Sequence, residues 1–521
     1  MILTIDLGTS GPKVSLFSNN AEYLHHEFEE NEVILLEQGG AEQSPLEWWD
    51  SIKRAYHKLI QNSKLDPKKI ETVICTSQWS GTVACDNELK PIGNAIIWMD
   101  SRGAKHIQKI ISGFPEVEGY QVFTLLKFLN KTSGAPGKSG KDPLSHILFL
   151  KEERPDVYKK TRVFLEPIDF LTLQFTGKPV ASYHTIALHW LTNMKDLKNV
   201  HYDDQLISMC KIDRKKLPDL IPANSVVGTV TESIQKEFGL NADTKVIMGC
   251  SDVMSAAVGS GAVVSGLPHV YIGTSSWLVT HLPFRVIDPL HNMATLPSAI
   301  PGLYLLTNEQ ETAGNCINFL KKNLFYAEDT LGASKAPADF YKSLDQEAAK
   351  VKPGSDGLMF LPWLYGERSP IEDHHVRGGF FNLSLNHSRP HFARAVLEGV
   401  ALNSRWLYKT VEKNAKTKFD RIHMIGGGAL SDLWCQIMAD VLGVKVCQMD
   451  NPIAANSQGI AFLACLALDR IKLEEIPARV KIKATYSPNA KNHELYSERF
   501  EEFKKYYDHN KKSMHSINKG L

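Results

Sequence analysis

The feature that most constrains the fold is a short pattern that occurs twice, about half a chain apart. Residues 3–11 read LTIDLGTSG, and residues 269–277 read HVYIGTSSW. Each copy combines a short apolar strand pattern, a Gly-Thr-Ser turn and further extended chain. One shared tripeptide would be unremarkable in a chain of 521 residues, but the shared context predicts two domains of one architecture, each presenting a glycine turn.

Strand and helix patterns alternate along the rest of the chain. Apolar spacing predicts helices over residues 391–408 and 433–442, the second with Ser431 as its N-cap. The charged segment 493–511 keeps apolar residues at helical spacing, which predicts an amphipathic surface helix. Mixed strands and helices over this length indicate α/β layers. We expect strands at residues 2–5, 14–17, 70–75, 245–249, 270–273, 422–426 and 444–448.

Composition excludes several classes of protein. The chain has 43% apolar and 22% charged residues, which is not typical of disordered, collagen-like or coiled-coil chains. Its net charge of +1 gives no bulk attraction to nucleic acid or anionic membranes, so we expect neither as a partner. The N-terminus shows no signal sequence, and no apolar run is long enough to span a membrane. Eight cysteines without a C-x-x-C pair indicate reduced thiols, and we expect a cytoplasmic protein.

The first Gly-Thr-Ser turn is a candidate contact for phosphate. Gly8 lets the backbone approach an anion, and the hydroxyls of Thr9 and Ser10 can point at phosphate oxygens. Asp6, at the end of the strand pattern, could hold Mg²⁺ through water. The alternative interpretation is a simple hairpin turn.

The second turn, formed by Gly273, Thr274 and Ser275, could clamp the same phosphates from the other domain. Two better-known nucleotide motifs are absent. The segment around residues 137–139 reads Gly-Lys-Ser but lacks the earlier glycine of a P-loop, so we interpret residues 133–143 as a surface loop. No dinucleotide fingerprint follows the first strand pattern.

A third glycine turn precedes the helix predicted at 433–442. Gly427, Gly428 and Ala429 follow an apolar strand pattern, where a flat ring or a phosphate can lie on bare backbone. The alternative is a tight strand-to-helix turn. Asp252 also follows a strand pattern and precedes small residues, a position that suits either a helix N-cap or a catalytic base.

These turns lie in segments that resemble the FGGY family of carbohydrate kinases. Further resemblances keep the family's order along nearly the whole chain, although Asn382 stands where the family usually has glycine. The segments are EQSPLEWWDSI (residues 42–52), AIIWMDSR (95–102), GCSDVMSAAVGSGAV (249–263), GGFFNLSLNHSRPHFARAVLE (378–398) and IGGGALSDLWCQIMADVLGVKV (425–446).

The resemblance implies a fold of two ribonuclease-H-like domains, of the actin, hexokinase and Hsp70 ATPase type, with a cleft between them. Residues 259–268 form the best boundary zone, and we assign residues 1–250 to a sugar-binding domain and 251–521 to an ATP-binding domain. The implied reaction is phosphoryl transfer from ATP, with Mg²⁺, to a sugar hydroxyl. Asp252 would accept the hydroxyl proton, Asp6 would hold the metal, the first two turns would contact phosphates, and Gly427, Gly428 and Ala429 would contact adenosine.

The sugar would be recognised by Gln78, Trp79 and Ser80, together with Asp252. The Arg-Glu pair of glycerol kinases is absent at this place, and so is the histidine of many xylulose kinases. We expect Trp79 to stack on the sugar with its ring nitrogen free to donate, although a core position is the alternative. Val253 replaces a residue that is often polar in the family.

Segments around residues 273–277, 308–314 and 360–370 look most like family members that act on xylulose. A ketopentose, xylulose first, is therefore the expected substrate, with another ketose or a polyol as the alternative.

A homodimer is possible, because dimers are common in the family. Two other classes stay open: an ATP-switched chaperone or filament protein of the same fold, and a catalytically silent sugar sensor.

Overall fold

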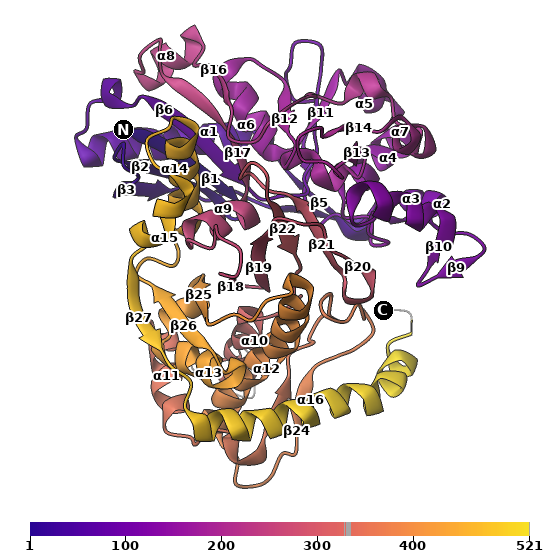
Figure 1. Ribbon diagram of the computed structural model, residues 1–521, viewed down its shortest axis with the longest axis vertical. Helices are drawn as coiled ribbons and strands as arrows, with labels where there is room; N and C mark the ends of the chain where they lie inside the picture. Colours follow the sequence, from indigo (N-terminus) through magenta and orange to yellow (C-terminus); the bar gives the residue numbers. More distant parts are fainter. Residues whose placement is uncertain (328, 330–334, 520–521) are drawn as a thin grey trace.

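Two mixed β-sheets of the same topology form the framework of the protein (Figure 1). A computed structural model describes residues 1–327, 329 and 335–519. The first sheet has the strand order β16-β17-β6-β1-β2-β3. In it β1 pairs antiparallel with β2 and parallel with β6, which pairs parallel with β17. Its strands are β1 (Ile2–Gly8), β2 (Gly11–Phe17), β3 (Tyr23–Phe28), β6 (Thr72–Ser77), β16 (Val226–Thr229) and β17 (Lys245–Ser251).

The second sheet repeats this arrangement and extends it at one edge. Its order is β20-β21-β22-β19-β18-β25-β26-β27. Here β18 pairs antiparallel with β19 and parallel with β25, which pairs parallel with β26. The strands are β18 (His269–Ile272), β19 (Ser276–Leu282), β20 (Ile287–Asp288), β21 (Met293–Pro297), β22 (Tyr304–Thr307), β25 (Arg421–Ile425), β26 (Lys445–Met449) and β27 (Ile482–Tyr486).

The order β27-β26-β25-β18-β19-β22 therefore matches the whole first sheet strand for strand, including the directions of pairing. Both Gly-Thr-Ser turns join the equivalent antiparallel pair, β1 to β2 and β18 to β19. The predicted duplication of one architecture is confirmed.

Strand β1 is buried on both faces, as expected for a strand in the middle of a covered sheet. Side chains alternate between faces along a strand. Leu3, Ile5 and Leu7 share one core with α1 (Pro45–Ser63) and α6 (Pro167–Thr176). Ile2 belongs to a different core on the opposite face, so Asp6, which has the same parity as Ile2, also lies on that opposite face.

Helices α9 (Asp252–Gly259) and α14 (Ala455–Ala467) occupy the core between the two sheets (Figure 1). Their apolar residues share one cluster with Ile2 and Ile247 of the first sheet and Val279 and Ile425 of the second. The α14 helix comes from the second half of the chain but packs on β1 and β6.

Two glycines bring these helices into backbone contact. A Cβ at Gly459 would lie 1.8 Å from the carbonyl oxygen of Ser255, and a Cβ at Gly259 would lie 1.8 Å from that of Ala455. Only a residue without a side chain permits such an approach. Each helix therefore contributes one glycine that allows direct contact with the backbone of the other helix.

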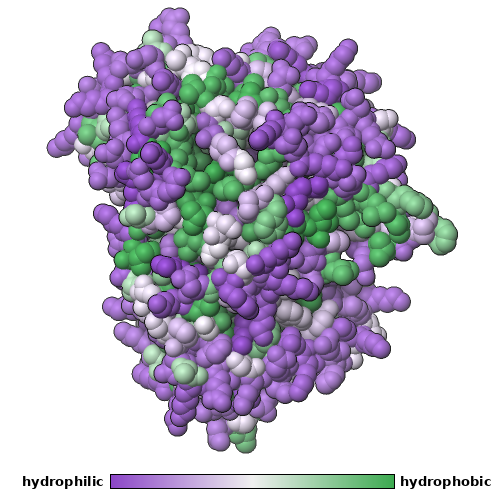
Figure 2. All heavy atoms as spheres, in the orientation of Figure 1, coloured by the Kyte–Doolittle hydropathy of each residue, from purple (hydrophilic) through white to green (hydrophobic). Residues whose placement is uncertain are grey.

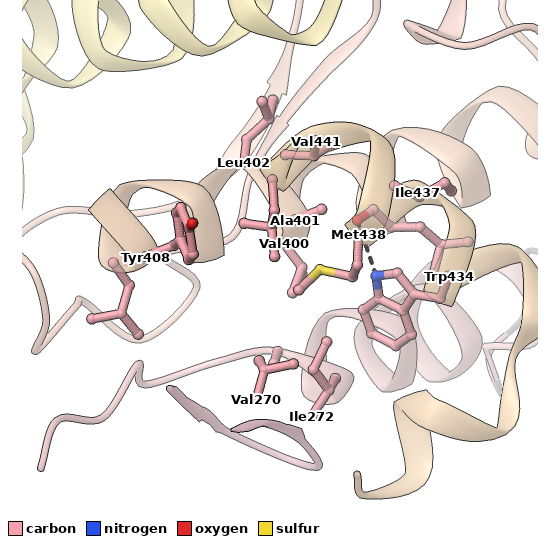
Figure 3. Packing of buried hydrophobic residues seen from close by; sticks show 14 of the residues in the cluster. Val270, Ile272, Val400, Ala401, Leu402, Tyr408, Trp434, Ile437, Met438 and Val441 are labelled. Carbon is pink, nitrogen blue, oxygen red and sulfur yellow. Dashed lines mark hydrogen bonds between the residues drawn. The ribbon is translucent and has the colours of Figure 1, made fainter. Parts of the chain in front are cut away.

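On the other face of the second sheet lie α12 (Arg389–Ala415) and α13 (Asp432–Leu442). Figure 3 shows side chains of both helices packing together above Val270 and Ile272 of β18. The indole nitrogen of Trp434 donates to the carbonyl oxygen of Leu397 at 3.1 Å, which ties α13 to α12. The long α16 (Ala490–Ile517) packs against α13, and its buried Tyr496 donates to Glu398 of α12 at 2.7 Å. Phe503 of α16 also lies against the Trp406 ring of α12.

The remaining elements complete the two lobes. The helices are α2 (Ala104–Ile111), α3 (Val122–Thr132), α4 (Pro143–Glu153), α5 (Pro155–Lys160), α7 (Asp204–Cys210), α8 (Glu232–Phe238), α10 (Gly314–Phe319), α11 (Phe340–Ala349) and α15 (Ile476–Arg479). The short strands are β4 (Ile34–Leu36), β5 (Gly40–Gln43), β7 (Val83–Cys85), β8 (Ala95–Ile96), β9 (Glu116–Val117), β10 (Tyr120–Gln121), β11 (Val163–Leu165), β12 (Val180–Ser182), β13 (Thr192–Asn193), β14 (His201–Tyr202), β15 (Asp219–Ile221), β23 (Met359–Leu361) and β24 (Gly379–Phe381).

The predicted elements are present, with longer helices than the sequence indicated. Ser431 caps α13 by accepting from the backbone N–H of Trp434 at 3.0 Å. Asn382 has a φ of 61°, a left-handed conformation that explains why glycine suits this position in the family. All eight cysteines are free and buried. Within the described part of the chain, no helix has the length and apolar character needed to cross a bilayer.

We expect the substitution Gly459→Ala to destabilise the protein by about 3 kcal/mol, because the new methyl group meets backbone that cannot rotate away. Thermal and urea unfolding would measure the loss. Gly379→Ala is the matched control, since its Cβ would meet the Phe381 ring at an ordinary 3.5 Å. Equal unfolding midpoints for the two variants would contradict the proposed role of the helix contact.

Candidate active site

Asp252 and Asp6 form a pair of acids between the lobes. Asp252 is the first residue of α9, and the N-cap is its neighbour Ser251, which accepts from the backbone N–H of Met254 at 3.4 Å. The N-cap interpretation of Asp252 is therefore wrong. The Asp252 carboxylate accepts from the N–H of Val253 at 2.8 Å. Asp6 is buried in β1 and hydrogen-bonds with the side chain of Asn456 at the start of α14.

The surroundings of Asp252 bring the pKa of its carboxyl close to neutral pH. The pKa of Asp252 is raised from 3.8 to about 7, mainly by burial, and the negative charges of Asp6 and Glu309 contribute to this rise. Burial also raises the pKa of Asp6, which Lys13 on the adjacent strand lowers in part. Lys13 was not predicted; it places a cation beside the acid pair, opposite Asp6 in the β1–β2 register.

The first Gly-Thr-Ser turn is held by a network of side chains behind it. The Thr9 hydroxyl donates to Gln78 at 2.9 Å and accepts from the indole nitrogen of Trp98 at 3.0 Å. Gln43 donates to the Thr9 carbonyl at 2.8 Å and accepts from Gln78 at 2.7 Å. Gln78 is thus buried in contacts that fix the turn, while Ser10 is exposed. The structure brings the predicted phosphate turn and part of the predicted sugar segment together.

The second turn lies close to the acid pair. A Cβ at Gly273 would be 2.1 Å from the Tyr271 hydroxyl, so that hydroxyl lies against the turn. Burial raises the pKa of Tyr271 to about 12, and the charges of Asp252 and Asp6 add to the effect. The carbonyl oxygens of Gly273 and Thr274 accept from backbone N–H groups at the start of α10. Thr274 is exposed and Ser275 partly exposed. Sequence reasoning missed Tyr271, since nothing local distinguishes it from a core aromatic residue.

The third turn, residues 426–429, packs against the end of β18. Gly426 has a φ of 84°, and a Cβ there would meet the Ile272 carbonyl at 2.5 Å. A Cβ at Gly428 would meet the Ile272 side chain at 2.6 Å. Gly427 has open space around it and is exposed. Ala429 is fully buried, so among the three predicted contact residues of this turn Gly427 is the one with exposed backbone.

Segments 308–314 and 360–370, which the sequence singled out only as resemblances, supply a charged cluster at the site. The Arg368 guanidinium pairs with both Glu309 and Glu311. Glu367 is buried and accepts from the Glu311 N–H at 2.8 Å and from Asn403 of α12 at 2.6 Å. The negative charge of Glu309 also contributes to the raised pKa of Asp252, although burial is the larger cause. No individual residue of this cluster was predicted, because its members are far apart in sequence.

The predicted sugar segment is held differently from the expectation. The Trp79 indole nitrogen donates to the Thr185 carbonyl at 3.0 Å, so it is not free to donate, contrary to our prediction. The Trp79 ring is partly exposed and lies against His184, with ring centroids 4.6 Å apart. The Ser80 hydroxyl donates to the Lys141 carbonyl at 2.8 Å. These contacts position the segment, and its contact with a sugar stays a prediction.

His184 joins Trp79 to the helix that carries Asp252. Its Nδ1 lies 2.8 Å from the Pro297 carbonyl, which requires a donating N–H there, and its Nε2 lies 2.8 Å from the Ser251 hydroxyl. Burial lowers the pKa of His184 to about 4, so the ring is neutral at physiological pH. Nε2 therefore accepts from Ser251, the residue that caps α9.

The acid pair fits a magnesium ion that is bound mainly by phosphate and water. Mg²⁺ prefers oxygen ligands and keeps several waters in nucleotide sites. Within the described residues, no group of three or more His, Cys, Asp and Glu side chains could hold a metal. A single carboxylate such as Asp6, beside the phosphate turns, is consistent with this mode of binding.

Comparison with known proteins decides the family. The model of the FGGY family of carbohydrate kinases, N-terminal domain, matches residues 1–259, and that of the C-terminal domain matches residues 269–468. The chain belongs to the FGGY family of carbohydrate kinases. As an FGGY kinase it is a phosphotransferase that uses ATP and Mg²⁺, and its fold is the two-domain ribonuclease-H-like fold.

Relatives of this FGGY kinase cover nearly the whole chain. It is 28% identical over 519 residues to a xylulose kinase of Staphylococcus epidermidis, covering 98% of this chain and 97% of that protein. It is 28% identical over 452 residues to a gluconokinase of Bacillus subtilis, covering 85% and 83%. Two structures from Lactobacillus acidophilus, a gluconate kinase and a ligand-bound xylulose kinase, are each 26% identical with a TM-score of 0.86; both alignments cover 99% of this chain, with 99% and 100% of those chains.

The interval between the two family matches lies within the predicted boundary zone of residues 259–268. The division of the chain at residue 250, and the roles assigned to single residues, stay predictions.

Proposed function

We propose that this FGGY kinase transfers the γ-phosphoryl group of ATP to a hydroxyl of a ketopentose, with D-xylulose as substrate and D-xylulose 5-phosphate as product. The observation that carries the proposal is Asp252, a partly buried carboxyl whose pKa is raised to about 7, beside Asp6. Full-length relatives named xylulose kinase support the choice of sugar.

In the proposed reaction the sugar hydroxyl oxygen forms a bond to the γ-phosphorus as the bond to the ADP oxygen breaks. The hydroxyl proton passes to the Asp252 carboxylate, and ADP leaves with the electron pair of the broken bond. Phosphoryl transfer needs little more from the protein than alignment and charge neutralisation. Mg²⁺, held through Asp6, would neutralise phosphate charge when bound.

Three turns would hold the nucleotide in this scheme. The backbone of the first two, with exposed hydroxyls, would face phosphate oxygens, and the exposed backbone of the third would face adenosine. Lys13, beside Asp6, would add a positive charge for the phosphates. The residues assigned to contacts are Gly8, Thr9, Ser10, Gly273, Thr274, Ser275 and Gly427, while the buried Gly428 and Ala429 shape the third turn.

Trp79 and Ser80 would form one wall of the sugar site, with Gln78 supporting it from behind. The partly exposed Trp79 ring can pack on the C–H face of a sugar while its nitrogen stays bonded to Thr185. Gluconate is the second candidate substrate. Lys141 lies within electrostatic reach of Arg368 and Glu309, so it offers a cation near the acid pair that a sugar acid could use.

A coupled ADP-release assay over ketopentoses, ketohexoses, polyols and gluconate tests the substrate. We expect D-xylulose to give the highest kcat/KM, at least about tenfold above gluconate, which corresponds to about 1.4 kcal/mol of transition-state binding. A higher value for gluconate would replace the proposed sugar, and no ADP release with any compound would support the catalytically silent alternative.

Replacing the proposed base should nearly abolish turnover while ATP still binds. For Asp252→Asn we expect kcat to fall about 10²- to 10⁴-fold, the usual contribution of a general base. In the unmodified enzyme, kcat/KM should fall below a pH of about 7, because the carboxyl must be ionised to accept the proton. Unchanged turnover, or an acid limb that persists in the variant, would exclude this role.

Thermal unfolding of the same variant provides a control for its folding. Because folding raises the pKa of Asp252 from 3.8 to about 7, the folded state binds the proton more tightly, and stability falls as pH rises through this window. Asp252→Asn removes that cost. Its unfolding midpoint should therefore exceed that of the unmodified protein at pH 8, with a smaller difference at pH 5.

We also propose that the enzyme works in the cytoplasm as a homodimer. Eight buried free cysteines suit a reducing compartment. Figure 2 shows apolar residues on the projecting segment that carries β9, β10 and α3, where Phe114, Val117, Phe123 and Leu126 are exposed. A patch of this kind often marks an interface. Sedimentation should give a dimer that Phe123→Glu converts to a monomer; a monomeric unmodified protein would contradict the proposal.

A further inference from the structure

A basic pocket lies on the outer side of the second lobe. Its volume is about 700 Å³, and it is formed by the C-terminal half of α12, the chain between α12 and β25, the end of α13 with the turn before β26, and the start of α16. Six of its lining residues carry nitrogen cations or can do so: Arg405, Lys409, Lys413, Lys416, Lys418 and His493.

This pocket is separate from the nucleotide turns. The lining segments 416–419 and 442–444 lead into the amino ends of the parallel strands β25 and β26. The third glycine turn follows the opposite, carboxyl end of β25. A strand of this length separates the two places by roughly 15 Å, at about 3.3 Å per residue. The pocket therefore lies at the other edge of the sheet from the proposed adenosine contact.

Arg405 is the feature that points to a ligand. Its side chain is buried, with only 7% of the residue exposed, yet it lines the pocket. Nη2 donates to the Ser497 hydroxyl at 2.9 Å. Nε and Nη1 are buried and have no hydrogen-bond partner among the residues that the structure describes. Nε and Nη1 point from different edges of the guanidinium, so each is a separate donor without an acceptor in the described part of the chain.

The acids near Arg405 do not neutralise the pocket. Glu412 is already engaged, because it accepts from Tyr408, Lys418 and the Phe419 N–H. Glu501 on α16 attracts Arg405 and Lys409 electrostatically, but its ion pair is with Lys504 at 2.8 Å.

Positive charges also crowd one another here. Burial lowers the pKa of Lys409, and the neighbouring charges of Arg405, Lys504 and Lys418 lower it further, while Glu501 opposes them. An anion between these cations would relieve their repulsion and offer an acceptor to an unpartnered Arg405 nitrogen.

We propose that this pocket is a second, non-catalytic site that binds a small phosphate-bearing molecule, whose phosphate group accepts a hydrogen bond from an unpartnered nitrogen of Arg405 and forms an ion pair with Lys409. The volume admits a phosphorylated compound of metabolite size. This inference does not depend on which sugar the kinase phosphorylates.

Calorimetry on the full-length protein, saturated with ADP and Mg²⁺ so that the catalytic site is occupied, tests the proposal. The probes are inorganic pyrophosphate and glycerol 3-phosphate, at a fixed 150 mM salt because weak surface attraction is screened there. We expect one binding event per chain for at least one probe, and a Kd at least about tenfold higher in Arg405→Gln.

Two further variants keep the result interpretable. Lys409→Gln combined with Lys413→Gln changes exposed lining residues that cannot prevent folding, and it should weaken binding about tenfold or more. Arg479→Gln, which removes a surface arginine outside the pocket, should leave binding unchanged. The proposal is overturned if neither probe binds the ADP-loaded protein, or if the double lysine variant binds as tightly as the unmodified protein.

Discussion

The backbone contact between α9 and α14 is the constraint on which the site depends. Gly259 and Gly459 let the two helices touch, and only then do their amino ends, with Asp252 on one and Asn456 on the other, meet above Asp6. Since α14 is supplied by the second half of the chain and lies on the first sheet, this contact also joins the lobes. A side chain at either glycine would force the helices apart and disturb the contact between Asn456 and Asp6.

Duplication explains why two similar turns approach one place, and the differences between them show why each needs its own support. The first turn is fixed by polar side chains, with the Thr9 hydroxyl between Gln78 and Trp98. The second is fixed mainly through backbone, by hydrogen bonds to the start of α10 and by the Tyr271 hydroxyl against Gly273. The repeated fold therefore places a turn at the equivalent position of each sheet, while the surrounding residues make each turn rigid in a different way.

Sequence reasoning succeeded where the signal was local. A few adjacent residues are enough to indicate the strands, the Ser431 cap and the glycine turns. The family resemblance pointed to Asp6 and Asp252. It failed for contacts between distant segments. The Trp79 indole binds a carbonyl in another segment of the lobe, and Arg368 meets Glu309 and Glu311 across a gap that no local pattern spans. Burial, which gives Asp252 its raised pKa, is likewise a property of the assembled lobes.

One turn of α12 connects the candidate active site with the basic pocket. Asn403, Ser404 and Arg405 are consecutive, and successive helical residues point about 100° apart. Asn403 donates to Glu367, which holds the Glu311 backbone behind the Arg368 cluster. Ser404 donates to Gln310 at 3.4 Å, and Arg405 turns toward Ser497 and the basic pocket. All three are buried, although polar residues in a helix core lower stability unless they are bonded. Asn403 and Ser404 are hydrogen-bonded within the protein, whereas two nitrogens of Arg405 have no acceptor among the described residues. The same turn of α12 therefore supports the candidate active site through Asn403 and places the charge of Arg405 at the basic pocket, at the opposite edge of the sheet.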